Sequence, residues 1–179
     1  TGIPIDSNAG GYFGPLLKFS GWDALELQGK TEKELVIFID GNKGLIQFCD
    51  AEGLPEDSHL LAEELTRNYA ESEEDQVNVS VVSSGSAARN ILYGMLNFSF
   101  YDPRRKVVRF KQAARGGLGT IMLDKGIKAL VVRYKGIKGN TNNPADVATL
   151  NRIGVKYHKE MHDLDEKQNG MRKIGTANT

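Results

Sequence analysis

The residues best suited to chemistry form one glycine-rich segment, Lys111-Gln112-Ala113-Ala114-Arg115-Gly116-Gly117-Leu118-Gly119. Three glycines within four residues remove side chains that would keep a ligand from the main chain, and they permit positive φ angles. Successive N–H groups can then converge on one anion, and the planar fork of Arg115 matches a phosphate. The segment follows a basic run that starts at Arg104. It predicts a site for a small phosphate-bearing ligand.

Two histidines provide a weaker candidate. His158 and His162 lie four residues apart on one face of a predicted helix, a spacing at which two imidazoles can share a zinc ion. The metalloprotease pattern needs Glu directly after the first histidine, and Lys159 occupies that position. A solvated helix face is therefore the preferred interpretation. His59 has no partner nearby in sequence and is interpreted as a residue at a helix start.

The remaining candidates each have a plain structural alternative. Cys49 is interpreted as a small core residue rather than a nucleophile, because no nearby group would lower the pKa of its thiol. The cluster Arg104-Arg105-Lys106 is either a solvated loop or a rim of positive charge around an anionic ligand. Tyr12 and Trp22 either stack on a flat ring or belong to the core.

Hydrophobic periodicity indicates the elements that position these residues. Helices are expected at 12–19, 60–69, 117–123 and 147–164, and strands at 24–27, 35–39, 45–48, 77–82 and 128–134. The turn Asp40-Gly41-Asn42 makes a hairpin of two strands, and Asp57-Ser58 can cap a helix. Residues 90–100 fit a strand or a helix. The mixture predicts an α+β domain over 1–136, followed over 137–179 by a linker and the first helix of a helical domain.

Composition excludes several classes of protein. The 179 residues include 23 Lys or Arg and 23 Asp or Glu, so the net charge is zero. A general nucleic-acid binder would carry a basic excess. No apolar run approaches the ~18 residues of a membrane span, and the first residues lack the pattern of a signal peptide. The single cysteine suits a reducing compartment, so we expect a cytoplasmic protein, and the Gly-rich start suggests an internal piece of a longer chain.

Two stretches of the sequence resemble the first domain of the tungsten-containing aldehyde ferredoxin oxidoreductases. Ser7-Asn8-Ala9-Gly10-Gly11-Tyr12-Phe13-Gly14 is similar to the family's Asn-Ser-Gly-Gly-Tyr-Phe-Gly turn. Ala114-Arg115-Gly116-Gly117-Leu118-Gly119-Thr120-Ile121-Met122 is similar to its Gly-Arg-Gly-Gly-Val-Gly-Ala-Val-Met. Lys125-Gly126-Ile127-Lys128-Ala129-Leu130 and the end of the chain continue the likeness, which spans nearly all residues.

The resemblance implies a fold and a cofactor. The fold is a pair of stacked β-sheets with flanking helices that form a base for a tungsten (or molybdenum) ion held by two pterins. Magnesium bridges the pterin phosphates, and the main-chain carbonyls of Asn8 and Gln112 are expected to face it. The implied cofactor-binding residues are Asn8, Gly10, Gly11, Lys111, Gln112, Ala114, Arg115, Gly116 and Gly117. No catalytic residue of the family falls within this chain.

The resemblance also implies an activity. The whole enzyme would oxidise an aldehyde to a carboxylic acid, or run a related low-potential reduction. Electrons would pass through a [4Fe–4S] cluster, bound by residues outside this chain, to ferredoxin or an electron-transfer subunit. A homo-oligomer is compatible with this scheme, and we expect no turnover from residues 1–179 alone.

A non-catalytic scaffold or partner-binding subunit that keeps the fold without the cofactor is the alternative. It is favoured by Lys111-Gln112-Ala113-Ala114-Arg115, where the family typically has Arg-Ala-Ala-Gly-Arg, and by the absence of four cysteines. A nucleotide-binding module is less favoured, because no Gly-X-Gly-X-X-Gly follows a strand.

Overall fold

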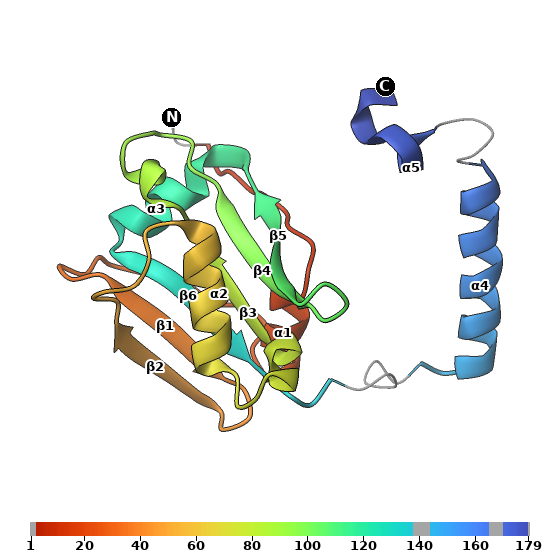
Figure 1. Cartoon of the computed structure of the whole chain (residues 1–179), viewed down its shortest axis with the longest axis horizontal. Coiled ribbons are helices and arrows are strands. Elements are labelled where there is room, and N and C mark those ends of the chain that lie inside the picture. Colours follow the sequence, from red (N-terminus) through yellow and green to blue (C-terminus); the bar gives the residue numbers. More distant parts are fainter. Residues whose placement is uncertain (1–2, 138–143, 165–169, 179) are drawn as a thin grey trace. The chain divides into compact units, whose positions relative to one another are not determined.

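The computed structural model describes residues 3–137, 144–164 and 170–178. The chain divides into two compact units, Thr1–Ile137 and Lys138–Thr179, and the first unit holds the sheet (Figure 1). Strands and helices occur together in this first unit in an order that is not a simple βαβ repeat. The predicted α+β class is therefore confirmed.

Six strands form one mixed sheet in the first unit. They are β1 (Leu35–Asp40), β2 (Leu45–Asp50), β3 (Val79–Ser83), β4 (Leu96–Asp102), β5 (Val107–Ala113) and β6 (Ile127–Arg133). Their order across the sheet is β2-β1-β6-β3-β4-β5. Strands β1 and β6 are parallel, and the other neighbours are antiparallel. The last strand of the described residues, β6, thus lies in the middle of the sheet.

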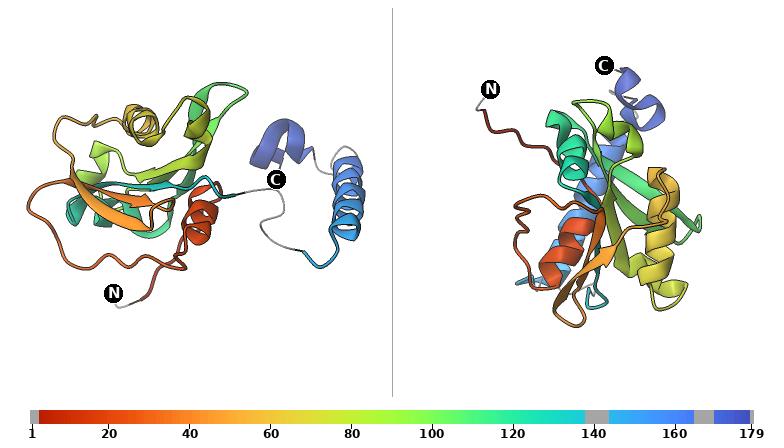
Figure 2. Two further views of the ribbon diagram at one scale, coloured as in Figure 1. Left: turned by 90° about the horizontal axis from the view of Figure 1, so that it is seen from below. Right: turned by 90° about the vertical axis from the view of Figure 1, so that its left-hand side faces the viewer.

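Helices cover both faces of this sheet, as the right-hand view of Figure 2 shows. Helix α2 (Ser58–Tyr69) packs on one face, where Leu61 and Leu65 join a buried cluster with Val36. Helices α1 (Phe13–Phe19) and α3 (Leu118–Asp124) lie on the other face, where Phe13 and Met122 join a second cluster. Neighbouring residues of a strand point to opposite faces. The central strands are consequently buried almost throughout and mostly apolar, as expected for a sheet covered on both sides, although Ser80, Lys128 and Arg133 are among their buried polar residues.

The elements outside the sheet are short, apart from one long helix. The 3-10 helices of the first unit are η1 (Glu74–Asn78), η2 (Ser86–Arg89) and η3 (Arg115–Gly117). The second unit contains α4 (Val147–Leu164), α5 (Met171–Ile174) and η5 (Gly175–Asn178). The bounds of α4 match the predicted helix. Among the described residues, no helix has the length and apolar character needed to cross a membrane.

Two expectations about strands are wrong. Residues 24–27 are not a strand: the segment is extended, and Leu25 and Leu27 pack on the core cluster of Phe13, but no neighbouring strand pairs with it. The described residues also form one sheet rather than two stacked sheets. Helices and this extended segment supply the layers on either side of it. The open choice over 90–100 is resolved as strand β4, which begins only at Leu96.

Candidate cofactor-binding site

The N-terminal glycine turn and the glycine-rich segment meet at the end of β5. The amide N of Arg115 donates a hydrogen bond to Oγ of Ser7 at 3.2 Å, across 108 residues of sequence. A Cβ atom on Gly11 would lie 3.6 Å from Cγ of Lys111, so the N-terminal turn also touches the edge strand. The N-terminal trace runs alongside β5 in Figure 1. The two motifs quoted from the sequence are therefore neighbours in space.

The conformation of the glycine segment depends on two glycines. Gly116 has φ +80° and Gly117 has φ +70°, a region that residues with a Cβ rarely adopt. A Cβ on Gly117 would collide with the carbonyl oxygen of Leu92, and one on Gly116 would collide with the side chain of Ile5. The backbone of the segment therefore lies close against the 92–95 loop and the N-terminal segment. Gly117 is required by packing whatever the segment binds.

Ala114, which replaces a glycine typical of the family, causes no strain here. Its φ of −99° and ψ of −15° lie in the right-handed region open to every residue. The sequence departure at this position therefore removes no conformational freedom that the turn uses.

Two exposed cations flank the turns. Lys111 is the fifth residue of β5 and Arg115 follows that strand. Neither has a carboxylate partner among the ion pairs of the described residues. Both charges are available to an anion at the point where the glycine turns meet.

The cluster Arg104-Arg105-Lys106 is not part of this site. It forms the turn between β4 and β5, at the opposite end of β5 from Arg115. Nη1 of Arg105 lies 2.8 Å from Oδ2 of Asp102, and this hydrogen bond lowers the pKa of the Asp102 carboxyl. Lys106 pairs with Glu73 at 3.7 Å. The solvated-loop interpretation accounts for these contacts.

Sequence reasoning named Tyr12 as an aromatic candidate but missed Phe100 and Arg109, which lie beside it. The Tyr12 ring, 54% exposed, lies 5.8 Å from the Phe100 ring, and the Arg109 guanidinium lies 5.9 Å from the same ring. Arg109 and Phe100 are directly paired across β4 and β5. The period of two along Val107–Ala113 places Arg109 on the same face as Lys111, and that alternation was the available signal.

His59 and Cys49 belong to other elements of the first unit than the glycine site, and the two histidines of α4 belong to the second unit. His59 lies in the first turn of α2, as interpreted, with its ring edge-on to Phe110 at 4.7 Å. Cys49 is a half-buried free thiol packed against the α2 cluster. His158 and His162 are exposed on α4. The described part of the chain contains no group of three His, Cys, Asp or Glu side chains placed to hold a metal ion.

The donor set at the glycine site fits a pterin that carries phosphate groups. The main-chain N–H groups of Gly10 and Gly11 donate no hydrogen bond within the described residues. Together with Lys111 and Arg115 they offer donors and positive charge without a competing carboxylate. Such a set matches phosphate oxygens, which are acceptors only.

The fold and this site define an α+β domain in which two glycine turns meet beside two exposed cations. The family model described as aldehyde ferredoxin oxidoreductase, N-terminal domain, matches residues 1–134. The chain belongs to the aldehyde ferredoxin oxidoreductase family, and the resemblance seen in the sequence is confirmed.

Curated relatives agree with this assignment. The tungsten-containing aldehyde ferredoxin oxidoreductase of Pyrococcus furiosus is 33% identical over 136 residues, and the protein of that name from Thermococcus kodakarensis is 32% identical over 136 residues. Each match covers 74% of this chain and 20% of the relative. The chain thus spans about a fifth of the length of the relatives it matches.

A solved structure shows the same fold. The active site complex BamBC of benzoyl coenzyme A reductase, in complex with 1,5-dienoyl-CoA, superposes with a TM-score of 0.52 and 27% identity. The match covers 71% of this chain and 17% of that one. The structural neighbour is thus also an oxidoreductase.

Proposed function

We propose that this chain is the cofactor base of a tungsten (or molybdenum) pterin oxidoreductase that oxidises an aldehyde to a carboxylic acid. One observation carries the proposal: in a member of this family, the two glycine turns meet beside Lys111 and Arg115. When bound, the metal and its pterins supply the two-electron chemistry, and the protein supplies binding and orientation. No catalytic residue is assigned within the chain.

The proposed roles of the site residues follow their positions. Asn8, Gly10 and Gly11 hold one pterin phosphate, and Lys111, Gln112 and Ala114 lie near the other. Arg115 contributes its fork, while Gly116 and Gly117 allow the main chain to approach. The main-chain carbonyls of Asn8 and Gln112 would hold a magnesium ion, a hard cation that takes oxygen ligands.

Electrons leave the site through groups that this chain does not provide. A [4Fe–4S] cluster takes four cysteines, and this sequence has one. In the proposal the cluster is bound by other residues of the protein, and ferredoxin or an electron-transfer subunit is the acceptor. The relatives are named ferredoxin oxidoreductases, which supports this choice.

A second candidate function is a low-potential reduction of the aromatic acyl group of a coenzyme A thioester. The structural similarity to benzoyl coenzyme A reductase favours it, and it would use the same cofactor base. Assays of the whole protein with aldehydes and with aromatic acyl-CoA thioesters would separate the two activities.

The first test is the metal content of the whole protein that carries this chain. After anaerobic purification we expect stoichiometric tungsten or molybdenum by mass spectrometry. The Arg115→Ala variant should lose most of it, whereas Arg104→Ala, in the turn at the far end of β5, should retain it. A protein with neither metal would overturn the proposal and favour the scaffold alternative.

A second test uses residues 1–179 and magnesium pyrophosphate as a probe. Binding should shift the amide NMR signals of Gly10, Gly11 and Gly116. A hydrogen bond to a charged group contributes about 1.5–3 kcal/mol, so Arg115→Ala should weaken binding by roughly tenfold or more. Equal affinity of Arg115→Ala and Arg104→Ala would contradict the assigned role of Arg115.

A further inference from the structure

The hydroxyl of Thr120 ties α3 to the 92–95 loop and to Ile91, which precedes that loop. Its Oγ1 atom accepts a hydrogen bond from the amide of Gly94 at 3.0 Å and donates one to the carbonyl of Ile91 at 2.8 Å. The amide of Gly119 donates to the carbonyl of Gly94 at 2.8 Å. Both main-chain groups of Gly94 are therefore bonded to neighbouring residues of α3, and we call these three hydrogen bonds the Thr120 clamp.

The clamped loop packs against the glycine segment with no space between the two backbones. A Cβ atom on Gly119 would collide with the carbonyl oxygen of Met95, just as one on Gly117 would collide with that of Leu92. The carbonyl of Met95 is itself fixed by a hydrogen bond from Oγ of Ser84 at 2.9 Å. Groups packed this closely cannot shift independently. The position of the loop therefore determines where the main chain can lie at Gly117.

Both ends of the glycine turn are anchored to one stretch of chain. Ala113, the last residue of β5, pairs with Leu96, the first residue of β4, and Leu96 directly follows the loop. Beyond the turn, Gly119 and Thr120 are held by the clamp. Residues 114–118 lie between these two anchors and include the cation and the glycines assigned to the ligand. The conformation of the turn therefore depends on the clamp as well as on the sheet.

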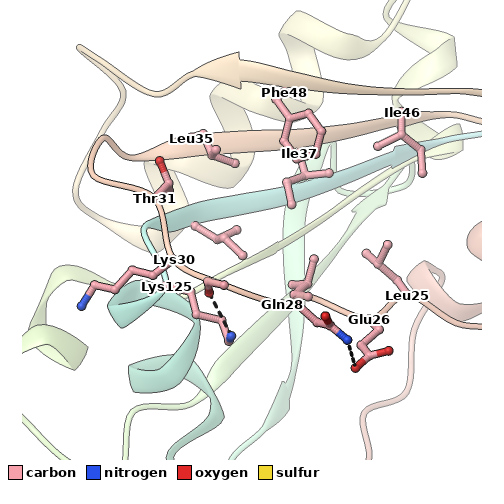
Figure 3. A pocket seen from close by; sticks show the side chains of 13 residues that line it. Leu25, Glu26, Gln28, Lys30, Thr31, Leu35, Ile37, Ile46, Phe48 and Lys125 are labelled. Carbon is pink, nitrogen blue, oxygen red and sulfur yellow. Dashed lines mark hydrogen bonds between the residues drawn. The ribbon is translucent and has the colours of Figure 1, made fainter.

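The opposite end of α3 is attached to a different part of the chain. Nζ of Lys125, the residue after α3, donates to the carbonyl of Gly29 at 3.0 Å, and the amide of Thr31 donates to the carbonyl of Lys125 at 3.1 Å. Figure 3 shows Lys125 reaching the extended segment that carries these residues. Loss of the clamp would therefore release the first turn of α3 and the glycine turn, while the end of the helix stays attached.

The clamp depends on a side chain that the family motif quoted above does not have. Thr120 occupies the position of the alanine in Gly-Arg-Gly-Gly-Val-Gly-Ala-Val-Met. An alanine side chain can neither accept a hydrogen bond from Gly94 nor donate one to Ile91. The clamp is therefore a feature of this chain rather than of the quoted motif.

We propose that Thr120 is a positioning residue that holds the glycine turn in its ligand-binding conformation. This role rests on the proposed function, in which Arg115 and Gly116 meet a phosphate group. Thr120 acts through Gly94 and the 92–95 loop rather than by contact with the ligand. A site whose conformation is fixed before the ligand arrives avoids the cost of ordering it on binding. The hydroxyl of Thr120 thus raises the affinity of the turn for phosphate.

Titration calorimetry of residues 1–179 with magnesium pyrophosphate tests this role. Thr120→Val removes the hydroxyl and keeps a similar shape. Apparent affinity falls in proportion to the fraction of molecules in the binding conformation, so a turn that is correctly placed about a tenth of the time should bind roughly tenfold more weakly. Thr120→Ser keeps the hydroxyl and should bind as the wild-type chain does. Thr120→Ala repeats the loss without a methyl group facing the amide of Gly94, in case the valine variant does not fold.

Ser99→Ala is the matched control for a general loss of stability. Oγ of Ser99 accepts a hydrogen bond from the buried amide of Val81 at 2.8 Å, within the sheet. Like Thr120→Val, this variant leaves a buried amide without its acceptor, so both should lower the urea midpoint. Only Thr120→Val should weaken the binding of magnesium pyrophosphate. Equal affinities of these two variants would assign Thr120 a structural role alone and overturn the proposal.

Amide NMR of the ligand-free chain separates this proposal from the proposed function. In Thr120→Val the signals of Gly116 and Gly117 should move, and the amide of Gly94 should exchange with solvent faster; Ser99→Ala should change neither. Unchanged signals of both glycines in Thr120→Val would overturn the positioning role. A wild-type chain that bound no magnesium pyrophosphate would instead contradict the proposed phosphate site, and the ligand-free signals would still decide whether Thr120 positions the turn.

Discussion

At the scale of single residues, the glycine segment separates what the fold needs from what a ligand would need. Gly117 is buried and meets the carbonyl of Leu92, whereas Lys111 and Arg115 are exposed. Changes to the glycine should therefore alter stability, and changes to the cations should alter binding. The two kinds of residue can be told apart experimentally, although they lie next to each other in sequence.

Gly117→Ala should destabilise the first unit strongly. The positive φ costs a residue with a Cβ roughly 1–2 kcal/mol, and the clash with the backbone of Leu92 adds about 1–3 kcal/mol. We expect a total loss of about 2–5 kcal/mol in the free energy of unfolding, measured by urea denaturation.

Gly53→Ala is the control for this prediction. Gly53 has φ +77°, but a Cβ there would meet nothing within 4 Å. Gly53→Ala should therefore lose only the part of the free energy of unfolding that comes from the positive φ angle. Equal stability of the two variants would contradict the tight packing of Gly117 against the 92–95 loop.

At the scale of elements, most predicted helices and strands are present because their signals are local. The 18-residue stripe of α4 and the capped start of α2 follow directly from periodicity and from Asp57. Ala24-Leu25-Glu26-Leu27 has an equally clear alternation, yet it forms no strand. Alternation reports which side chains are buried, but a strand also needs a neighbour for its main chain, and that depends on residues distant in sequence.

The cap of α2 leads to a prediction about pH. The Asp57 carboxylate accepts hydrogen bonds from the amides of Leu60 at 3.1 Å and His59 at 2.8 Å, and these lower its pKa below the value of 3.8 in an unfolded chain. A lowered folded-state pKa means that the contribution is fully present above pH 3.8 and is lost as pH falls through the folded-state pKa. Asp57→Ala should lower the urea midpoint at pH 7, and the difference from wild type should shrink in acid.

Asp57→Asn provides the control for the titration. Asparagine also caps helices, but it carries no titrating carboxyl. Its urea midpoint should exceed that of Asp57→Ala at every pH, without a loss in acid that follows the titration of residue 57. A wild-type advantage over Asp57→Ala that stayed constant down to pH 2 would contradict the assigned role of the carboxylate.

At the scale of the whole molecule, both core clusters lie within the first unit. Their buried members run from Phe13 to Val132. The first unit therefore has the hydrophobic interior that a separate domain requires. Chain truncation after Ile137 should leave the urea midpoint of this unit unchanged. A clear loss of stability, or cleavage within 35–133 by protease in the truncated chain, would show that residues 138–179 contribute to its fold.

The order of the strands in the sheet could not be predicted from the sequence. Residues 35–39 and 45–48 identify their own hairpin through a turn between them, but nothing local indicates that β6 lies between β1 and β3. The same holds for the candidate site, where the contact of Ser7 with Arg115 spans most of the first unit. The residues could be named from their motifs, whereas their proximity depends on the order of the strands.

The central position of β6 has a consequence for co-translational folding of this domain. Before Ile127–Arg133 emerges, the β1–β2 hairpin and the β3–β4–β5 meander have no strand to join them. Until then, the strand edges of β1 and β3 that will pair with β6 are unpaired. Each of these edges can associate with a neighbouring nascent chain. Translation of seven late residues then closes the sheet in one step. Slow codons just before this strand would lengthen that vulnerable interval, and a chaperone at the exit tunnel would matter most there.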